Sequence, residues 1–242
     1  RLSRGLGDVY KRQGYFASLA APAFSVERGF FEDAFSLTLT APAGATLVYT
    51  TDGTAPGDGN GTRVEPGDGV AAATLSVTTT ALVRAMAVQE GALSSPIATH
   101  TYLFLEDVIR QPAAPSGFPA TWDGISQDAV SADYEMDPEV VDDPAYTDDL
   151  LAGLRDIPTL SIVADPDDLF GDDDGIYVHS LQRGDDWERA VSLELLTPDG
   201  DTGFAETAGL RIHGYGWRYH SSTLKHAFRL EFRSEYGPSK LE

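Results

Sequence analysis

Apolar and polar residues alternate along much of the stretch from residue 20 to residue 104, as they do in strands with one buried face. The segment AFSLTLT (34–40) follows a period of two. The strand that begins ATLVYT ends in an Asp52-Gly53 turn, and the Gly, Asp and Asn residues that follow are typical of a loop. Three further β-rich runs lie between residues 72 and 105. Strands at this spacing predict a small β-sandwich over residues 20–104.

Residues 105–145 have a different composition. QPAAPSGFPATWDG is rich in Pro, and DYEMDPEVVDDPAY is acidic and interrupted by Pro. Proline excludes a continuous helix or an inner strand from such segments. We predict an ordered linker, because Phe118, Trp122, Tyr134 and Met136 give it side chains to bury.

Residues 146–242 combine predicted strands with short helical turns. A helix is expected in YTDDLLAGLRD with Thr147 as a candidate N-cap, and one helical turn in DPDDLF, where Asp165 caps and Pro166 begins the helix. Strands are predicted at 157–165, 175–178, 188–196, 208–214 and 225–232, with a hairpin-like connection at 197–203. The region 146–242 is therefore predicted to be α+β with a mainly antiparallel sheet, in a chain that is mainly β.

The composition indicates a folded, acidic protein. Hydrophobic residues make up 42% of the 242 residues, and Lys and Arg number 17 against 38 Asp and Glu. The net charge of −21 argues against a nucleic-acid partner, because phosphate backbones require a basic surface. The acidity alone indicates only solubility. The absence of cysteine excludes disulfides and Cys-based zinc sites, and no apolar stretch approaches the ~20 residues of a membrane helix, so no membrane span is expected.

Both ends of the sequence depart from the pattern of a natural domain. The first thirteen residues, RLSRGLGDVYKRQ, contain four basic residues and one acidic residue, without alternation or a cap. We interpret residues 1–13 as a non-native extension that resembles translated sequencing adaptor. The alternative is a basic arm that binds an anionic surface. The last residues, SEYGPSKLE, do not close an element, so we expect truncation at both ends and no export signal within this sequence.

A cationic segment near the end of the chain contrasts with the acidic remainder. Between Arg211 and Lys240 there are six basic and two acidic residues, a local charge of 6 − 2 = +4. With a period of two, Leu210 and Ile212 share one face of a predicted strand, and Arg211 and His213 share the other.

The segment 225–232 repeats this arrangement, with Phe228 and Leu230 on one face and Lys225 and Arg229 on the other. If the two strands pair, the basic residues share one side of a sheet beside the loop GYGWRYHSST. Because Lys and Arg bind phosphate and glycine amides can approach an anion, a polyphosphate site is one hypothesis. The alternative is a solvated outer face of the sheet. The predicted nucleotide-binding residues are Arg211, His213, Gly214, Gly216, Arg218 and Lys225.

Three other clusters contain residue types that bind metals, but their spacing in the sequence matches no known metal-binding motif. Asp52, Asp58 and Asn60 could bind calcium or serve a turn. The acidic residues of 165–174 could hold a cation or solvate a loop, and the three histidines of 213–226 could share a metal or be unrelated. We predict no metal site from them. No carboxylate pair or Ser-His-Asp set selects a hydrolase.

The first region resembles a known accessory module. LVYTTDGTAP (47–56), VRAMAVQEG (83–91) and ATHTY (98–102) are similar to the chitobiase/β-hexosaminidase C-terminal type of domain. The resemblance covers most of residues 20–104. It implies an immunoglobulin-like sandwich without catalytic residues.

The last region resembles the start of the spore-coat protein H (CotH) kinase family. The most specific pieces are PTLSIV, GIYV, WERAVSLEL, GLRIHG and KHAFRL with FRSEYG, all within residues 155–242. The resemblance implies the N-terminal lobe of a kinase-like fold that uses ATP with a divalent cation such as Mg²⁺. Lys225 would correspond to the strand lysine of the family, and Arg218 to the arginine after its glycine turn. The sequence departs from the family pattern at Tyr215, Trp217 and Ala227.

We therefore expect a fragment of a secreted CotH-like protein kinase that transfers phosphate to protein hydroxyls. Its catalytic and metal-binding carboxylates are expected beyond residue 242, so this piece alone is predicted to be inactive. The alternative is a non-catalytic surface protein whose sandwich attaches to a glycan or a neighbouring protein. Both interpretations place the protein outside the cell or at its surface.

Overall fold

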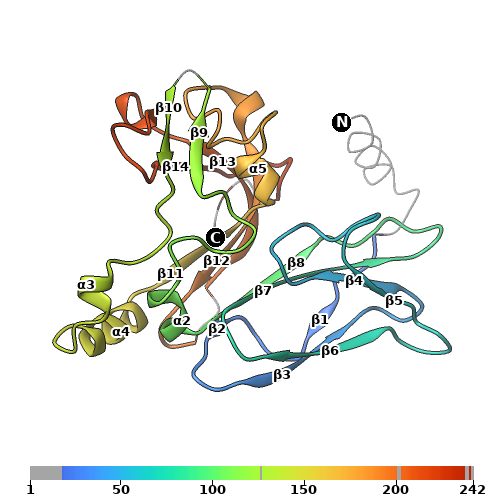
Figure 1. The fold of residues 1–242 in the computed structure, drawn as a ribbon. Coiled ribbons are helices and arrows are strands. Elements are labelled where there is room, and N and C mark those ends of the chain that lie inside the picture. Colours follow the sequence, from blue (N-terminus) through green and yellow to red (C-terminus); the bar gives the residue numbers. More distant parts are fainter. Residues whose placement is uncertain (1–17, 126, 201–202, 238–239, 241–242) are drawn as a thin grey trace. The chain divides into compact units, whose positions relative to one another are not determined.

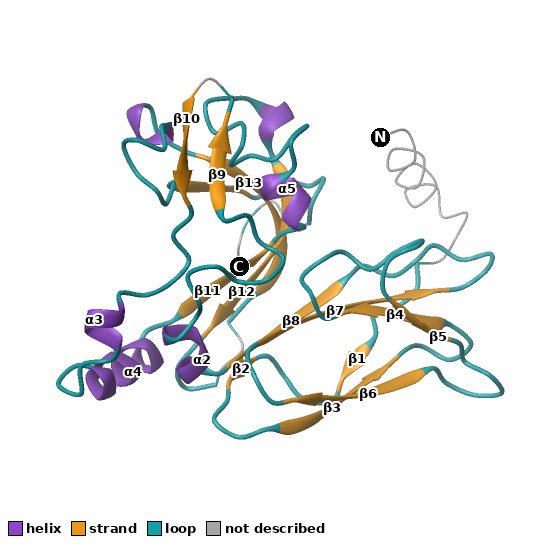
Figure 2. Cartoon of the chain, viewed as in Figure 1, coloured by secondary structure: helices purple, strands orange, loops and turns teal. Residues whose placement is uncertain are grey.

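The computed structural model describes residues 18–125, 127–200, 203–237 and 240, and it shows a mainly β protein with several sheets (Figures 1 and 2). The chain divides into two compact units. The first holds the described residues up to 28 together with 33–101, and the second holds 29–32 and the residues from 102 onward. The predicted extension 1–13 lies outside the described residues.

The first unit is built on two sheets, as predicted for a sandwich. A three-stranded antiparallel sheet has the order β1-β3-β6, and in a larger sheet this unit holds the strands β8-β7-β4-β5. The strand bounds are β1 Ala23–Phe24, β3 Phe35–Thr40, β4 Thr46–Thr50, β5 Thr62–Val64, β6 Ala72–Val77, β7 Ala81–Val88 and β8 Ala98–Leu103, whose last two residues fall in the second unit. The short strand β2, Gly29–Phe30, pairs with these two residues and also belongs to the second unit.

Alternation along β3 explains the core of the first unit. Leu37 and Leu39 are fully buried, whereas Ser36, which precedes Leu37 in the same strand, is exposed. In the other sheet, Leu47 of β4 and Val83 of β7 are also buried. Burying one apolar side chain of this size contributes about 1.5–3 kcal/mol, so these inward faces dominate the stability of the unit.

The second unit contains a four-stranded antiparallel sheet whose order, β11-β12-β13-β14, follows the sequence. A hairpin and short helices accompany it. The strands are β9 Thr121–Gly124, β10 Gln127–Ser131, β11 Thr159–Val163, β12 Arg189–Leu196, β13 Ala205–Ile212 and β14 Phe228–Glu231. The helices are α2 Leu105–Ile109, α3 Pro138–Val141, α4 Thr147–Asp156 and α5 Pro166–Phe170, with 3-10 turns at Asp185–Trp187 and Gly216–Arg218. Across the described residues, none of the helices has the length and apolar character needed to cross a bilayer.

One face of this sheet supplies the core of the second unit. Leu193 of β12 and Leu210 of β13 are buried together with Trp122, which belongs to the segment expected to be an ordered linker. The indole Nε1 of Trp122 donates to the hydroxyl of Tyr134 at 3.0 Å. The segment 105–145 thus contributes a hairpin and a core side chain to the second unit, while Phe118 is 45% exposed.

Most predicted elements of the second unit are present, and one is wrong. The strands expected at 157–165, 188–196, 208–214 and 225–232 correspond to β11 to β14, and α5 begins at Pro166 with Asp165 as its cap. The strand expected at 175–178 is instead a series of turns.

The apolar run at 175–178 is explained by core packing. The backbone amides of Ile176 and Tyr177 donate to the carbonyls of Asp168 and Leu169, at 3.0 and 2.8 Å. Their side chains pack into the core of the second unit. A short apolar run can be buried without pairing as a strand, so the pattern alone does not identify a strand here.

The helix expected near Thr147 is present, with a different start. The N-cap residue of α4 is Tyr146. The hydroxyl of Thr147 donates to the carbonyl of Val141 at 2.6 Å, so it ties the helix to the preceding turn.

Candidate functional site

The pairing of β13 with β14 creates an apolar face and a cationic face, as the alternation predicts. Leu210 lies opposite Leu230, and Arg211 lies opposite Arg229. Because side chains alternate along both strands, the two leucines face the core and the two arginines face the other side of the sheet.

A cleft of about 490 Å³ lies on the cationic side. This volume is within the usual range for small-molecule sites. Its lining holds four arginines and one histidine, and no Asp or Glu. The lining residues come from the loop before β12, from β13 and the loop after it, and from β14: Gln182, Arg183, Gly184, Trp187, Arg211, Ile212, His213, Gly214, Tyr215, Arg218 and Arg229.

Four of the six predicted site residues line this cleft: Arg211, His213, Gly214 and Arg218. Gly214 has φ +109°, a conformation that glycine adopts without strain, and it reverses the chain directly after β13. Gly216 begins the 3-10 turn Gly216–Arg218 and does not belong to the lining. The structure therefore brings together most of the predicted set, around a loop that depends on Gly214.

The guanidinium of Arg218 is buried and holds the cleft together. It donates to the carbonyls of Gly214 at 2.8 Å, Ser180 at 2.9 Å and Gln182 at 2.7 Å, and also to that of Ile212. Burial, and then the charge of Arg183, lower the pKa of Arg218, and an arginine still keeps its charge. Four of its five N–H donors bond to protein carbonyls, so Arg218 supplies mainly charge and shape to the cleft.

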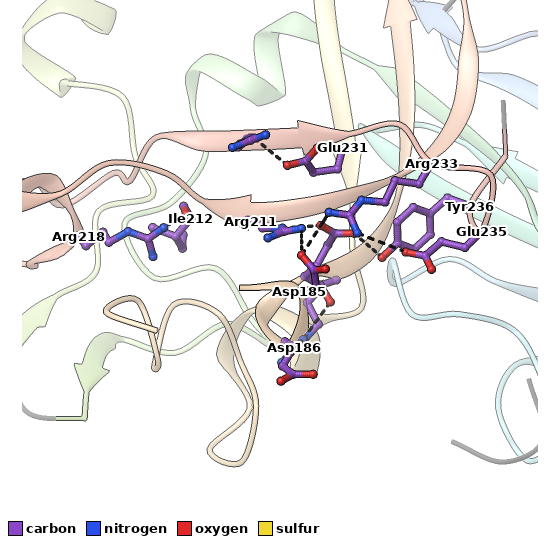
Figure 3. A network of polar contacts seen from close by, with 12 residues as sticks. Asp185, Asp186, Arg211, Ile212, Arg218, Glu231, Arg233, Glu235 and Tyr236 are labelled. Atoms are coloured by element: carbon purple, nitrogen blue, oxygen red, sulfur yellow. Dashed lines mark hydrogen bonds and ion pairs between the residues drawn. The ribbon is translucent and has the colours of Figure 1, made fainter. Parts of the chain in front are cut away.

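Arg211 is paired with two carboxylates. It contacts Glu188 through Nε and Asp185 through Nη2, the latter at 2.6 Å. Arg233 approaches both carboxylates at 3.3 Å, and the hydroxyl of Tyr236 donates to Glu188 at 2.7 Å. Figure 3 shows Arg211 and Arg233 beside Asp185, with Tyr236 next to Arg233. The positive charge of Arg211 is therefore largely compensated within the protein.

The protonation of this network is set by its contacts. Hydrogen bonds from Arg233 and Arg211 lower the pKa of the Asp185 carboxyl. Burial and the bond to Glu188 raise the pKa of Tyr236. Gly209 leaves the space for the buried carboxylate, because a Cβ at this position would overlap the side chain of Glu188.

Arg183 and Arg229 are the more available cations of the cleft. Arg229 pairs with Glu231 at 2.7 Å, but its side chain is 59% exposed. The guanidinium carbon of Arg183 lies 5.4 Å from the ring centroid of Tyr215. Within the part of the chain that the structure describes, no carboxylate pairs with Arg183.

Lys225 lies away from the cleft. Its amine is 3.4 Å from a carboxylate oxygen of Asp133, its side chain is 62% exposed, and it borders a separate acidic depression with Glu135 and Asp137. The expectation that Lys225 shares a face with Arg229 is wrong, because β14 begins only at Phe228 and the alternation does not extend back to residue 225.

The three histidines of 213–226 do not come together. His213 lines the cleft, whereas His220 and His226 are buried and contact each other, with 3.0 Å between Nδ1 of His220 and Nε2 of His226. Nδ1 of His226 lies 2.9 Å from the carbonyl of Trp217. Burial, and then the neighbouring charges, lower the pKa of His226. The buried pair therefore anchors the loop after β13.

The acidic candidates have structural partners. Asp52 accepts hydrogen bonds from the amide and hydroxyl of Thr54, at 3.0 and 2.6 Å. Asp168 and Asp174 pair with the buried Arg189 at 3.8 and 3.7 Å. Among the residues with described positions, no group of three His, Asp or Glu could hold a metal ion.

Sequence reasoning missed the contribution of the loop before β12. Arg183 and Trp187 lie in the segment QRGDDW, about twenty residues before β13, and no periodic pattern links the two segments. Arg229 was placed on the correct face by alternation without being assigned to the site.

Comparison with known proteins identifies the first region only. Residues 26–99 match the family model described as the chitobiase/beta-hexosaminidase C-terminal domain, in agreement with the resemblance seen in the sequence. No curated protein and no solved structure matches the chain. The CotH-like interpretation of residues 155–242 has no support from these comparisons and stays a prediction.

Proposed function

We propose that the second unit binds the phosphate groups of a nucleotide in the arginine-lined cleft, as the N-terminal part of a CotH-like protein kinase. The observation that carries the proposal is the lining of the cleft, where the exposed guanidinium groups of Arg183 and Arg229 lie beside Arg211 and the buried charge of Arg218. Such a concentration of guanidinium groups suits a polyanion, since arginine forms paired hydrogen bonds with phosphate oxygens.

The resemblance to the CotH family supplies the identity of the ligand as ATP and of the acceptor as a protein hydroxyl. It also implies Mg²⁺. The cleft does not fit this ion by itself, because Mg²⁺ is bound by carboxylate and phosphate oxygens and the lining contains no carboxylate. We therefore assign phosphate binding to this chain and no transfer step. The same proposal places the protein outside the cell or at its surface.

Titration calorimetry of the 242-residue chain with ATP, with and without Mg²⁺ and at low salt, tests the proposal. We expect Arg183→Ala to weaken binding about 10-fold. A charge-assisted hydrogen bond contributes about 1.5–3 kcal/mol, and the exposure of Arg183 to solvent places its bond to phosphate at the lower end of this range. Arg63→Ala, an exposed arginine of the first unit, is the matched control and should leave the affinity unchanged.

Lys225→Ala discriminates between the family-based and the structure-based assignment. The cleft predicts little effect from this substitution, because Lys225 borders a different depression. A loss with Lys225→Ala that equals or exceeds the loss with Arg183→Ala would assign the phosphates to the other site. The absence of any binding by the unsubstituted chain would remove the proposal.

The family match of residues 26–99 favours a second candidate function. Its description refers to chitobiase and β-hexosaminidase, and such a module would attach the chain to a glycan as part of a non-catalytic surface protein. Retention of the chain on insoluble chitin, together with no response to ATP, would favour this alternative. Failure to bind chitin and other common polysaccharides would count against it.

A further inference from the structure

An exposed aromatic side chain lies at the edge of the arginine-lined cleft. Tyr215 is 84% exposed, yet it belongs to the lining. The ring of Tyr215 faces the guanidinium of Arg183, with 5.4 Å from Cζ to the ring centroid. Trp187 adds a second aromatic ring to the same lining.

Packing within the protein does not explain this position. A large aromatic ring stabilises a fold by burial, and Tyr215 has little. Its neighbours Gly214 and Gly216 add no side chains that could cover it, and Gly214 turns the backbone at this point. Its ring therefore remains accessible to a molecule in the cleft.

We propose that Tyr215, held by Arg183, is a stacking subsite for the base of the nucleotide whose phosphates occupy the arginines. This inference rests on the proposed function and adds the group that recognises the rest of the ligand. A guanidinium over a tyrosine face is attracted to the ring and restrains it, so the platform is partly organised before the ligand arrives.

A nucleotide base fits this chemistry better than other anionic ligands. A base is planar and aromatic and stacks on aromatic side chains, whereas inorganic polyphosphate offers only charge. The cleft places the ring of Tyr215 and the available arginines Arg183 and Arg229 around one space, so a single ligand with a base at one end and phosphates at the other can contact both.

The test compares MgATP with magnesium tripolyphosphate as ligands of the 242-residue chain. Stacking of one base typically contributes enough to strengthen binding about 5- to 100-fold, so ATP should bind more tightly than tripolyphosphate by a factor in this range. Tyr215→Ala should abolish this preference and leave the affinity for tripolyphosphate within about 2-fold of the original. Tyr215→Phe keeps the ring and should keep the preference.

Tyr146→Ala is the matched control, since Tyr146 is also an exposed tyrosine of the second unit, at 56%, and lies outside the cleft. It should change neither affinity. Because both tyrosines are exposed, circular dichroism and thermal unfolding are expected to show folded variants.

Four outcomes would overturn the subsite. Equal affinities for ATP and tripolyphosphate in the unsubstituted chain, or a preference that survives in Tyr215→Ala, would remove it while leaving the phosphate site in place. Binding of polygalacturonate that depends on Tyr215, with no binding of ATP, would make the cleft a site for an acidic glycan. Failure of both phosphate ligands to bind would remove the proposed function and the subsite together.

Discussion

In the first unit, most of the fully buried side chains of the strands are apolar, as at Leu37 and Leu39, whereas the second unit also buries Glu188, Arg218 and His220. Arg84 is the buried charged residue of the first unit within the described ranges. A binary pattern of apolar and polar positions therefore accounts for most of the first unit. The second unit needs specific polar partners in addition, and this requirement coincides with the position of its cleft.

Burial of charge is costly, so the partners in the second unit are informative. Taking an ion out of water costs several kcal/mol unless charges and hydrogen bonds replace the lost hydration. Four carbonyls surround Arg218, and two arginines and a tyrosine surround Glu188. These contacts fix the two loops that border the cleft. The second unit therefore depends on buried polar contacts that hold the loops around its cleft.

The largest effect on stability in this comparison is expected from Arg218→Met. The substitution leaves four carbonyls without their donor, and two of these hydrogen bonds are buried, so we expect the unfolding free energy of the second unit to fall by about 3–5 kcal/mol. Urea denaturation measures the loss, and hydrogen exchange should rise in residues 180–182 and 212–218 while the first unit is unaffected. Arg63→Met, at an exposed site, should change stability by less than about 0.5 kcal/mol. Equal effects of the two substitutions would mean that the buried guanidinium has no structural role.

His100 is a feature of the first unit that should respond to pH. Burial, as the main cause, lowers the pKa of His100 to about 4. The unfolded chain, with a pKa near 6.5, then takes up a proton at higher pH than the folded chain. The stability from neutral His100 is complete above about pH 6.5 and declines as the pH falls toward 4.

The expected loss at pH 4 is on the order of 2–3 kcal/mol, since each pKa unit corresponds to about 1.4 kcal/mol. Urea unfolding from pH 7 to pH 4 of the original chain and of His100→Gln isolates this contribution from the carboxylates. Curves that stay parallel across this range would contradict the assigned shift.

A smaller effect sharpens the comparison within the second unit. Gly209→Ala places a Cβ where the Glu188 carboxylate is held by Arg211 and Tyr236, so the carboxylate must move. We expect a loss of about 1–2 kcal/mol in unfolding free energy, measured by urea denaturation. Gly153→Ala is the control, because the Cβ in helix α4 meets open space. It should stabilise the chain by up to about 1 kcal/mol, and a similar result at Gly209 would show that the carboxylate moves freely.

The features predictable from the sequence are those set by local periodicity. The alternation in 208–214 and 225–232 was sufficient to predict that Arg211 and Arg229 share the cationic face. The resemblance of the first region was visible in three short segments, and the family match confirms it. The ends of strands were harder to predict, because the start of β14 depends on where its pairing with β13 ends. Lys225 precedes this start and therefore lies outside the predicted site.

The features that could not be predicted depend on contacts between distant segments. Arg183 lies nearly thirty residues before Arg211, and only the folded chain brings its loop to the cleft. The compensation of Arg211 by Glu188 and Asp185 was likewise hidden, since a count of charges in residues 211–240 does not include carboxylates from before β12. Net charge of a sequence window therefore overestimated how many cations are available to a ligand.

The contact between His220 and His226 has a consequence for where protons reside. A carbonyl can only accept, so Nδ1 of His226 carries the hydrogen that points at Trp217. In the neutral ring Nε2 must then be an acceptor, which assigns the hydrogen between the rings to Nδ1 of His220. Both neutral imidazoles therefore carry their hydrogen on Nδ1, and the two hydrogen bonds run in one direction, from His220 to His226 and from His226 to the carbonyl of Trp217. Nitrogen-15 chemical shifts of the two rings would display this directional order.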